Sequence, residues 1–143
     1  MNVTCPPVVV AAGFGVTAAR RDGFPGVWCD PDGARPRKLG ALGLRVERDV
    51  TYHGIALNVT TDLSGFGLID PCGMPGIDVT SIAAEAGWSP DRSRPSTESV
   101  EDAGWRFARA FEAEIEAARA VDGGRVRDPG SAARAGGAGG SAP

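Results

Sequence analysis

Three side chains in this sequence have the chemistry for nucleophilic catalysis: Cys72, Lys38 and His53. Cys72 stands between Pro71 and Gly73. Proline fixes its own φ angle and glycine permits φ angles closed to other residues, so this thiol is predicted to lie on a defined turn. A free thiol is mostly protonated near neutral pH and becomes a useful nucleophile when a cation or a base stabilises its thiolate. Cys72 is therefore the candidate nucleophile, and we predict that it carries an acyl group.

The chain offers two partners for this thiol. Lys38 is the single lysine beside fourteen arginines, and His53 is the single histidine. A Cys72–Lys38 pair lets the ammonium stabilise the thiolate and lets the amine take and return a proton. A Cys72–His53 pair would resemble the dyad of thiol hydrolases. Spacing does not choose between them, and each residue also has an ordinary structural explanation: a buried apolar cysteine, a hydrogen-bonded histidine and a solvated lysine.

Small residues lie close to these candidates in the sequence. Glycine in a strand leaves room for a ligand or another backbone to approach. An acyl chain beside residues 41–43 and 54–56 would meet small apolar surfaces and backbone amides, and such amides can stabilise an oxyanion. The predicted substrate contacts are Ala41, Leu42, Gly43, Gly54, Ile55 and Ala56.

Two strands must position these groups. Residues 38–46 and 50–59 are both β-prone, and the short polar turn between them predicts an antiparallel hairpin. Residues 27–29 form a shorter β-prone run, residues 77–81 are extended, and residues 20–26 are predicted to be a loop.

Helices are predicted on either side of this hairpin. Residues 8–19 could form a short helix, while Cys5, Pro6 and Pro7 are expected to block regular structure. Thr80 or Ser81 can cap a short helix over residues 82–86, and apolar residues at helical spacing predict a longer helix over residues 98–121.

Composition bounds the class of protein. The 143 residues suit one domain, and 42% hydrophobic with 23% charged residues is typical of a folded chain. A formal net charge of -3 argues against a nucleic-acid surface. Three scattered cysteines without a CxxC pair argue against a disulfide framework and a thiolate zinc site. Reduced thiols in a cytoplasmic protein are the simpler interpretation of these cysteines. No apolar run reaches the ~20 residues of a membrane span.

The chain resembles octanoyltransferase, also called lipoyl(octanoyl) transferase or lipoate–protein ligase B. The resemblance covers roughly residues 20–118. It is carried by ordered motifs at residues 25–28, 37–46, 51–59, 62–63, 69–73 and 79–81.

The resemblance implies a fold and a reaction. The fold is the α+β fold of biotin and lipoate ligases, with a mixed sheet and packed helices, of which this chain would be the C-terminal portion. The family moves an octanoyl group from acyl carrier protein to a lysine of lipoyl domains, in 2-oxoacid dehydrogenases and the glycine cleavage H protein. The motif cysteine, matched by Cys72, forms an acyl-thioester. The motif lysine, matched by Lys38, lowers the pKa of that cysteine and acts as acid and base.

The resemblance also implies that the segments at residues 41–43 and 54–56 contact the acyl chain, that His53 belongs to the pocket wall, and that no metal, ATP or other cofactor is required. No nucleic acid and no membrane is expected as a partner.

The chain departs from the family in its first part. The Arg-Gly-Gly and His-Gly-Pro-Gly segments that complete the family's acyl pocket are missing here. We therefore expect residues 1–19 to be the remnant of a preceding helix, residues 20–122 to be the C-terminal catalytic part of a truncated domain, and residues 123–143 to be a disordered tail. Two alternatives to the transferase stay open: an inactive remnant or binding module, and a Cys72–His53 thiol hydrolase.

Overall fold

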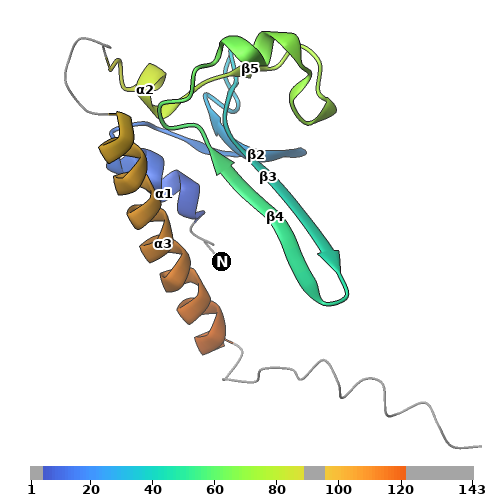
Figure 1. The fold of residues 1–143 in the computed structure, drawn as a ribbon, viewed down its shortest axis with the longest axis vertical. Helices are drawn as coiled ribbons and strands as arrows, with labels where there is room; N and C mark the ends of the chain where they lie inside the picture. Colours follow the sequence, from blue (N-terminus) through green and yellow to red (C-terminus); the bar gives the residue numbers. More distant parts are fainter. Residues whose placement is uncertain (1–4, 89–95, 122–143) are drawn as a thin grey trace, which may run out of the picture.

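The computed structural model describes residues 5–88 and 96–121 of the chain, without the side chains of residues 72, 96–98 and 121. The fold combines three α-helices, five strands and two 3-10 turns within these residues (Figure 1). In chain order they are α1 (Pro6–Gly13), β1 (Ala19–Arg21), β2 (Phe24–Cys29), β3 (Arg37–Glu47), β4 (Val50–Leu57), η1 (Ser64–Leu68), η2 (Pro71–Gly73), β5 (Asp78–Val79), α2 (Ile82–Glu85) and α3 (Ser96–Val121).

The strands form one mixed sheet. Its order is β1-β2-β3-β4 with antiparallel neighbours, and β5 runs parallel to the start of β3. The predicted α+β class with a mixed sheet and packed helices is therefore confirmed.

The predicted β3–β4 hairpin is also confirmed, with a continuous register from Gly40 opposite Leu57 to Glu47 opposite Val50. Arg48 and Asp49 make the turn, and both have positive φ angles (51° and 64°). Two-residue turns with positive φ match the twist of the strands they join.

The prediction of a loop over residues 20–26 is wrong. Ala19–Arg21 pairs with Phe24–Cys29, and Gly23, with a φ of 73°, completes the turn between them. β1 is short and carries two arginines, so it has no apolar alternation that a sequence pattern could detect. Its stability comes from pairing with β2, which is a tertiary effect.

The expectation that Cys5, Pro6 and Pro7 block regular structure is also wrong. Helix α1 begins at Pro6, and the amides of Val8 and Val9 donate to the Cys5 carbonyl (2.8 and 3.2 Å). Proline is well suited to the first turn of a helix because its missing N–H has no partner there in any case. α1 then packs against α3 (Figure 1).

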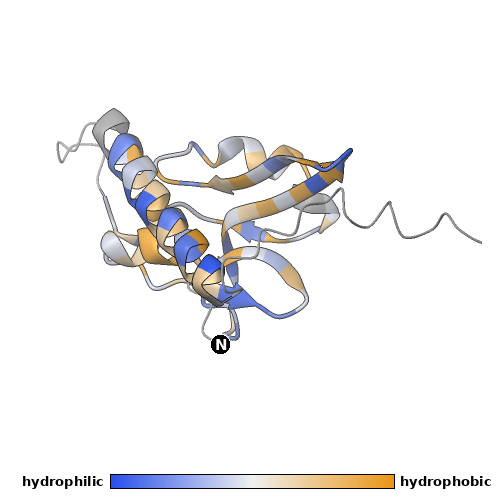
Figure 2. Ribbon diagram, turned by 90° about the horizontal axis from the view of Figure 1, so that it is seen from below, coloured by the Kyte–Doolittle hydropathy of each residue, from blue (hydrophilic) through white to orange (hydrophobic). Residues whose placement is uncertain are grey.

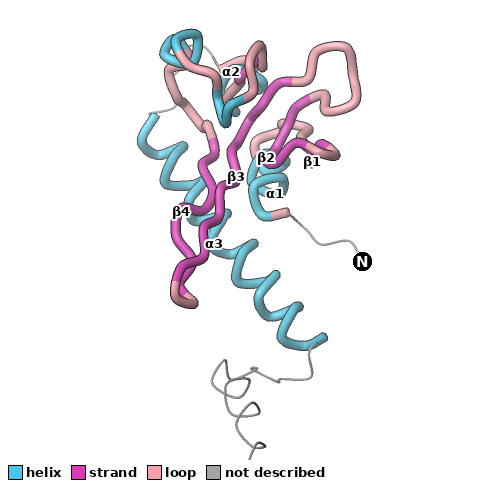
Figure 3. Tube along the Cα trace, turned by 90° about the vertical axis from the view of Figure 1, so that its right-hand side faces the viewer, coloured by secondary structure: helices cyan, strands magenta, loops and turns pink. Residues whose placement is uncertain are grey.

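The core lies where α1, α2 and α3 meet the sheet. It consists of Val10, Ala11, Val16, Val27, Cys29, Leu39, Val59, Ile82 and Ala103. The far end of the β3–β4 hairpin and the second half of α3 project beyond it (Figures 1 and 3). Apolar residues recur along the projecting hairpin (Figure 2). Leu44 and Val46 are 65% and 66% exposed there.

Candidate active site

Lys38 is buried at the start of β3, with only 3% of its surface exposed. It lies opposite Trp28 of β2 on one side and beside Val79 of β5 on the other. Its carbonyl oxygen accepts a hydrogen bond from the Thr80 amide (2.9 Å). Its ammonium nitrogen lies 5.2 Å from the centre of the Trp28 ring. Burying an ammonium costs free energy, so a lysine placed in this way is a candidate functional group.

The turn that carries Cys72 leads into the strand beside Lys38. Pro71 and Gly73, with a φ of 67°, bound the turn, and the Gly73 amide donates to the Asp70 carbonyl (3.1 Å). A short connection then reaches β5, which pairs with Arg37 and Lys38. The side chain of Cys72 lies outside the described part of the structure.

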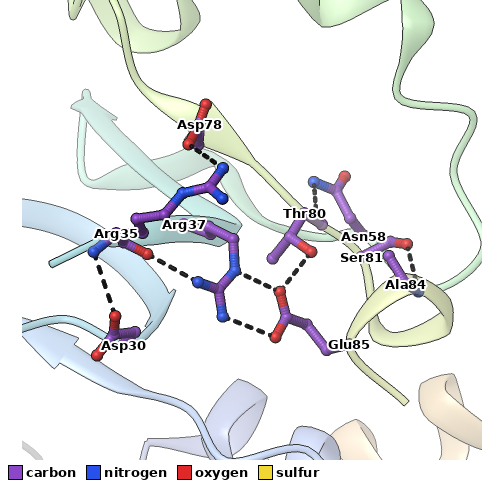
Figure 4. Close-up of polar contacts among 9 residues, drawn as sticks. All are labelled: Asp30, Arg35, Arg37, Asn58, Asp78, Thr80, Ser81, Ala84 and Glu85. Carbon is purple, nitrogen blue, oxygen red and sulfur yellow. Dashed lines mark hydrogen bonds and ion pairs between the residues drawn. The ribbon is translucent and has the colours of Figure 1, made fainter. Parts of the chain in front are cut away.

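A polar network next to Lys38 fixes the start of β3 (Figure 4). Arg37 donates two hydrogen bonds to the Glu85 carboxylate of α2 (2.7 and 2.9 Å). The Thr80 hydroxyl donates to the same carboxylate (2.7 Å). The Arg37 hydrogen bonds lower the pKa of Glu85, and the Glu85 hydrogen bond raises that of Arg37. Glu85 carries no signal in the sequence, because nothing near it in the chain links it to Arg37.

Asn58 connects β3 and the segment from Thr80 to α2 by hydrogen bonds of its backbone and its side chain (Figure 4). Its side-chain amide donates to the Thr80 carbonyl (3.1 Å), and its backbone amide donates to the Leu39 carbonyl (3.0 Å). Its own carbonyl accepts from the Ile82 amide (2.9 Å). Ser81 caps α2 by accepting from the Ala84 amide (3.2 Å), as predicted for a cap at Thr80 or Ser81.

A large hollow of about 960 Å³ opens near this site. This volume lies in the range of small-molecule pockets. The hollow is bounded by the start of α1, β1, β2, the β3–β4 hairpin and α3, and its lining residues on the hairpin are Ala41, Leu42 and Ile55. Of the six predicted substrate contacts, these three line the hollow, and Gly43, Gly54 and Ala56 lie on the same hairpin outside its lining.

Gly26 lies between the hollow and Lys38. Gly26 belongs to the lining of the hollow, and a β-carbon built on Gly26 would lie 3.1 Å from the Lys38 Cε atom and closer still to the Gly40 carbonyl oxygen. Gly26 has a φ of 125°, which other residues rarely adopt. The absence of a side chain here lets β2, β3 and the Lys38 stem lie together.

His53 lies far from this end of the sheet. It is exposed, has a φ of 70° and pairs with Leu44 on β3. Leu44 lies six positions after Lys38, which is roughly 20 Å along a strand. The His53 ring contacts the Tyr52 ring, with 5.4 Å between ring centres, and His53 does not line the hollow.

Cys29 is a second thiol near the polar network. It is 2% exposed and pairs with Arg37 across β2 and β3. Burial and, to a smaller extent, the negative charge of Glu85 raise the pKa of the Cys29 thiol to about 11, against an opposing effect of the Arg37 charge. Cys29 therefore stays protonated at neutral pH and packs as a small apolar residue.

The described residues offer neither a metal site nor a membrane-spanning helix. In residues 5–88 and 96–121, no group of three or more His, Cys, Asp or Glu residues is placed to hold a metal ion. None of the helices described is long and apolar enough to span a membrane.

The described residues thus combine a mixed sheet with a buried lysine and a turn that carries a cysteine. Residues 2–111 match the lipoyl protein ligase A/B catalytic domain, and the chain belongs to this family. The match includes most of the segment that the sequence analysis set apart as residues 1–19.

Several curated relatives carry the name octanoyltransferase. The protein of Desulfovibrio desulfuricans is 53% identical over 92 residues, which are 64% of this chain and 37% of the relative. Those of Mycobacterium sp. (strain KMS) and Acidothermus cellulolyticus are 51% and 49% identical over 81 and 80 residues. In both cases the match covers 56% of this chain, and it covers 34% and 36% of the relatives. The chain therefore spans about a third of the length of these relatives.

Proposed function

We propose that this chain carries the catalytic pair of an octanoyltransferase, with Cys72 as nucleophile and Lys38 as acid and base. The observation that supports the pair most directly is the burial of Lys38 at the strand into which the Cys72 turn leads. Similarity to proteins named octanoyltransferase supports the choice of acyl group.

The first half of the proposed reaction loads the enzyme. The neutral amine of Lys38 takes the proton of the Cys72 thiol and becomes an ammonium beside the thiolate. The thiolate sulfur then attacks the carbonyl carbon of octanoyl-acyl carrier protein. A new carbon–sulfur bond forms to Cys72 and the carrier thioester bond breaks. The proton held by Lys38 passes to the carrier thiolate.

The second half transfers the octanoyl group to an acceptor lysine. The amine of a lipoyl domain, from a 2-oxoacid dehydrogenase or the glycine cleavage H protein, attacks the Cys72 thioester. A carbon–nitrogen bond forms and the carbon–sulfur bond to Cys72 breaks. The proton lost by the amine passes through Lys38 to the Cys72 sulfur. An arginine could not serve in this role because its guanidinium keeps its proton. The proposed setting of both halves is the cytoplasm.

The hollow beside Gly26 is the proposed place of the octanoyl chain. Ala41, Leu42 and Ile55 line it, and Gly43, Gly54 and Ala56 lie on the same hairpin, on the face that carries Ala41. Gly26 lies between the hollow and the Lys38 stem.

Intact-mass spectrometry after incubation with octanoyl-acyl carrier protein tests the proposal. We expect one octanoyl adduct on the wild-type chain, none on Cys72→Ala, and an unchanged adduct on the matched control Cys29→Ala. Lys38→Arg keeps the charge and is expected to lose the adduct. Equal labelling of Cys72→Ala and wild type would refute the nucleophile, and an active Lys38→Arg variant would refute the acid/base role.

A second candidate function is a binding module that contacts lipoyl domains without transferring an acyl group. It is favoured by the exposed apolar residues of the β3–β4 hairpin. Binding of a lipoyl domain in a titration, together with no adduct on wild type, would support it. Any turnover would exclude it.

A further inference from the structure

Trp28 is the most deeply buried aromatic residue next to the candidate site. It is fully buried in β2, opposite Lys38 of β3. Directly opposed residues of an antiparallel pair project from the same face of a sheet. The Lys38 ammonium accordingly lies near the indole, 5.2 Å from the ring centre.

The Trp28 ring is held in one orientation by its neighbours. Its indole N–H donates to the Phe24 carbonyl (3.2 Å), and the Phe24 ring meets it edge-on with 6.0 Å between ring centres. The Arg21 guanidinium lies 5.2 Å from the Trp28 ring centre and 4.3 Å from that of Phe24. Arg21 and Phe24 both line the hollow. One ring therefore contacts the walls of the hollow and the buried lysine.

We propose that Trp28 is a positioning residue that holds the Lys38 ammonium at the end of the sheet where the Cys72 turn arrives. Its role in acyl transfer rests on the proposed function of Lys38. A buried ammonium needs compensation for the water it has lost, and the face of an indole supplies it through a cation–π interaction. A phenyl ring supplies a weaker version of the same interaction, and an aliphatic side chain supplies none.

The single lysine allows a direct test of this placement. The full chain is produced with ¹³C-labelled lysine, so one ε-methylene signal reports on Lys38 alone. We expect the ring current of Trp28 to move this signal away from its position in the unfolded chain. Trp28→Phe should keep part of the displacement and Trp28→Leu should abolish it. Trp105→Leu is the matched control, because Trp105 is exposed on α3.

A reciprocal variant keeps the placement testable if Trp28→Leu does not fold. Lys38→Met keeps an unbranched side chain that is one atom shorter and removes its charge. It should shift the indole N–H signal of Trp28 and leave that of Trp105 unchanged. An unmoved Trp28 signal, or a wild-type Lys38 signal at its unfolded position, would overturn the placement.

The reaction itself gives the second readout. Relative to wild type, Trp28→Leu should lower the rate of octanoyl-adduct formation about tenfold, equivalent to ~1.4 kcal/mol, and Trp28→Phe should restore most of it. Equal rates for Trp28→Phe and Trp28→Leu at intact fold would overturn the positioning role. If wild type forms no adduct, the proposed transferase fails, while the lysine and indole signals still decide whether Trp28 holds Lys38.

Discussion

Arg37 and Glu85 stand 48 residues apart in the chain and are joined by two hydrogen bonds of 2.7 and 2.9 Å. The pair connects the first residue of β3 to α2, directly before Lys38. Both side chains are mostly shielded, with 30% and 18% of their surfaces exposed. The pair is therefore expected to stabilise the fold more than an ion pair on the open surface would.

Glu85→Gln is expected to lower the free energy of unfolding by about 2 kcal/mol at neutral pH, because it removes the charge from a doubly bonded carboxylate. The pKa of Glu85 is lowered in the folded chain from its usual 4.5. Its stabilising contribution is thus complete above 4.5 and is lost as the pH falls through the lower folded pKa. Urea unfolding across this range should show the wild type and the variant converging in acid. A difference independent of pH, or one matched by Glu112→Gln on exposed α3, would contradict this account.

Gly26→Ala is expected to destabilise the fold by at least about 2 kcal/mol. A β-carbon there would press on the Gly40 carbonyl and on the Lys38 Cε atom, and the φ of 125° adds strain. Gly43→Ala on the same sheet is the control, since a β-carbon at Gly43 meets no atom within 4 Å. Thermal or urea unfolding of both variants measures the difference, and equal effects would show that the close approach at Gly26 is unimportant.

Cys29 should resist alkylation in the folded chain. It is 2% exposed, and its pKa of about 11 leaves almost no thiolate at neutral pH. Iodoacetamide followed by peptide mass analysis should modify Cys5, which is only partly buried, well before Cys29. Denaturant should abolish the difference between them. Rapid labelling of Cys29 in the native chain would show that β2 and β3 separate readily.

Leu44 and Val46 are expected to promote association of the isolated chain through the projecting hairpin. Both point from one face of the hairpin, together with Leu42 and Ile55, and all four are exposed. The other face carries a polar cluster, in which Tyr52 donates to Glu47 and Arg45 bonds to the same carboxylate. Leu44→Thr with Val46→Thr should reduce both the binding of a dye that reports exposed apolar surface and the concentration-dependent light scattering. The free energy of unfolding should change by less than about 1 kcal/mol. The control is Arg45→Thr on the polar face, which should leave both signals unchanged. An equal response from the two faces would argue against a role for the apolar one.

Local patterns in the sequence predicted much of the fold. The hairpin follows from two β-prone runs around a short polar turn, and its observed register runs through Arg48 and Asp49. The long helix predicted over residues 98–121 is α3 (Ser96–Val121), and the cap of α2 is Ser81. Each of these depends on residues within a few positions of one another, which is why a pattern could detect them.

Such local patterns predicted only some of the residues of the candidate site. Cys72, Lys38 and the hairpin segments were selected from their residue types and from the family motifs. Glu85 and Trp28 were not, because their importance arises from partners that lie on other elements. Strand β1 was not predicted for a similar reason, because Arg20 and Arg21 become strand residues only through pairing with β2.

By itself, the sequence determined the chemical groups, the turn at Pro71 and Gly73 and the helices and hairpin that local rules specify. Only the tertiary structure decided that Lys38 is buried, that Trp28 lies against it, and that Arg37 meets Glu85. The physical reason is that burial and pairing are properties of contacts between distant segments. Such contacts form when β2, β3, β5 and α2 pack together, and no single segment encodes them.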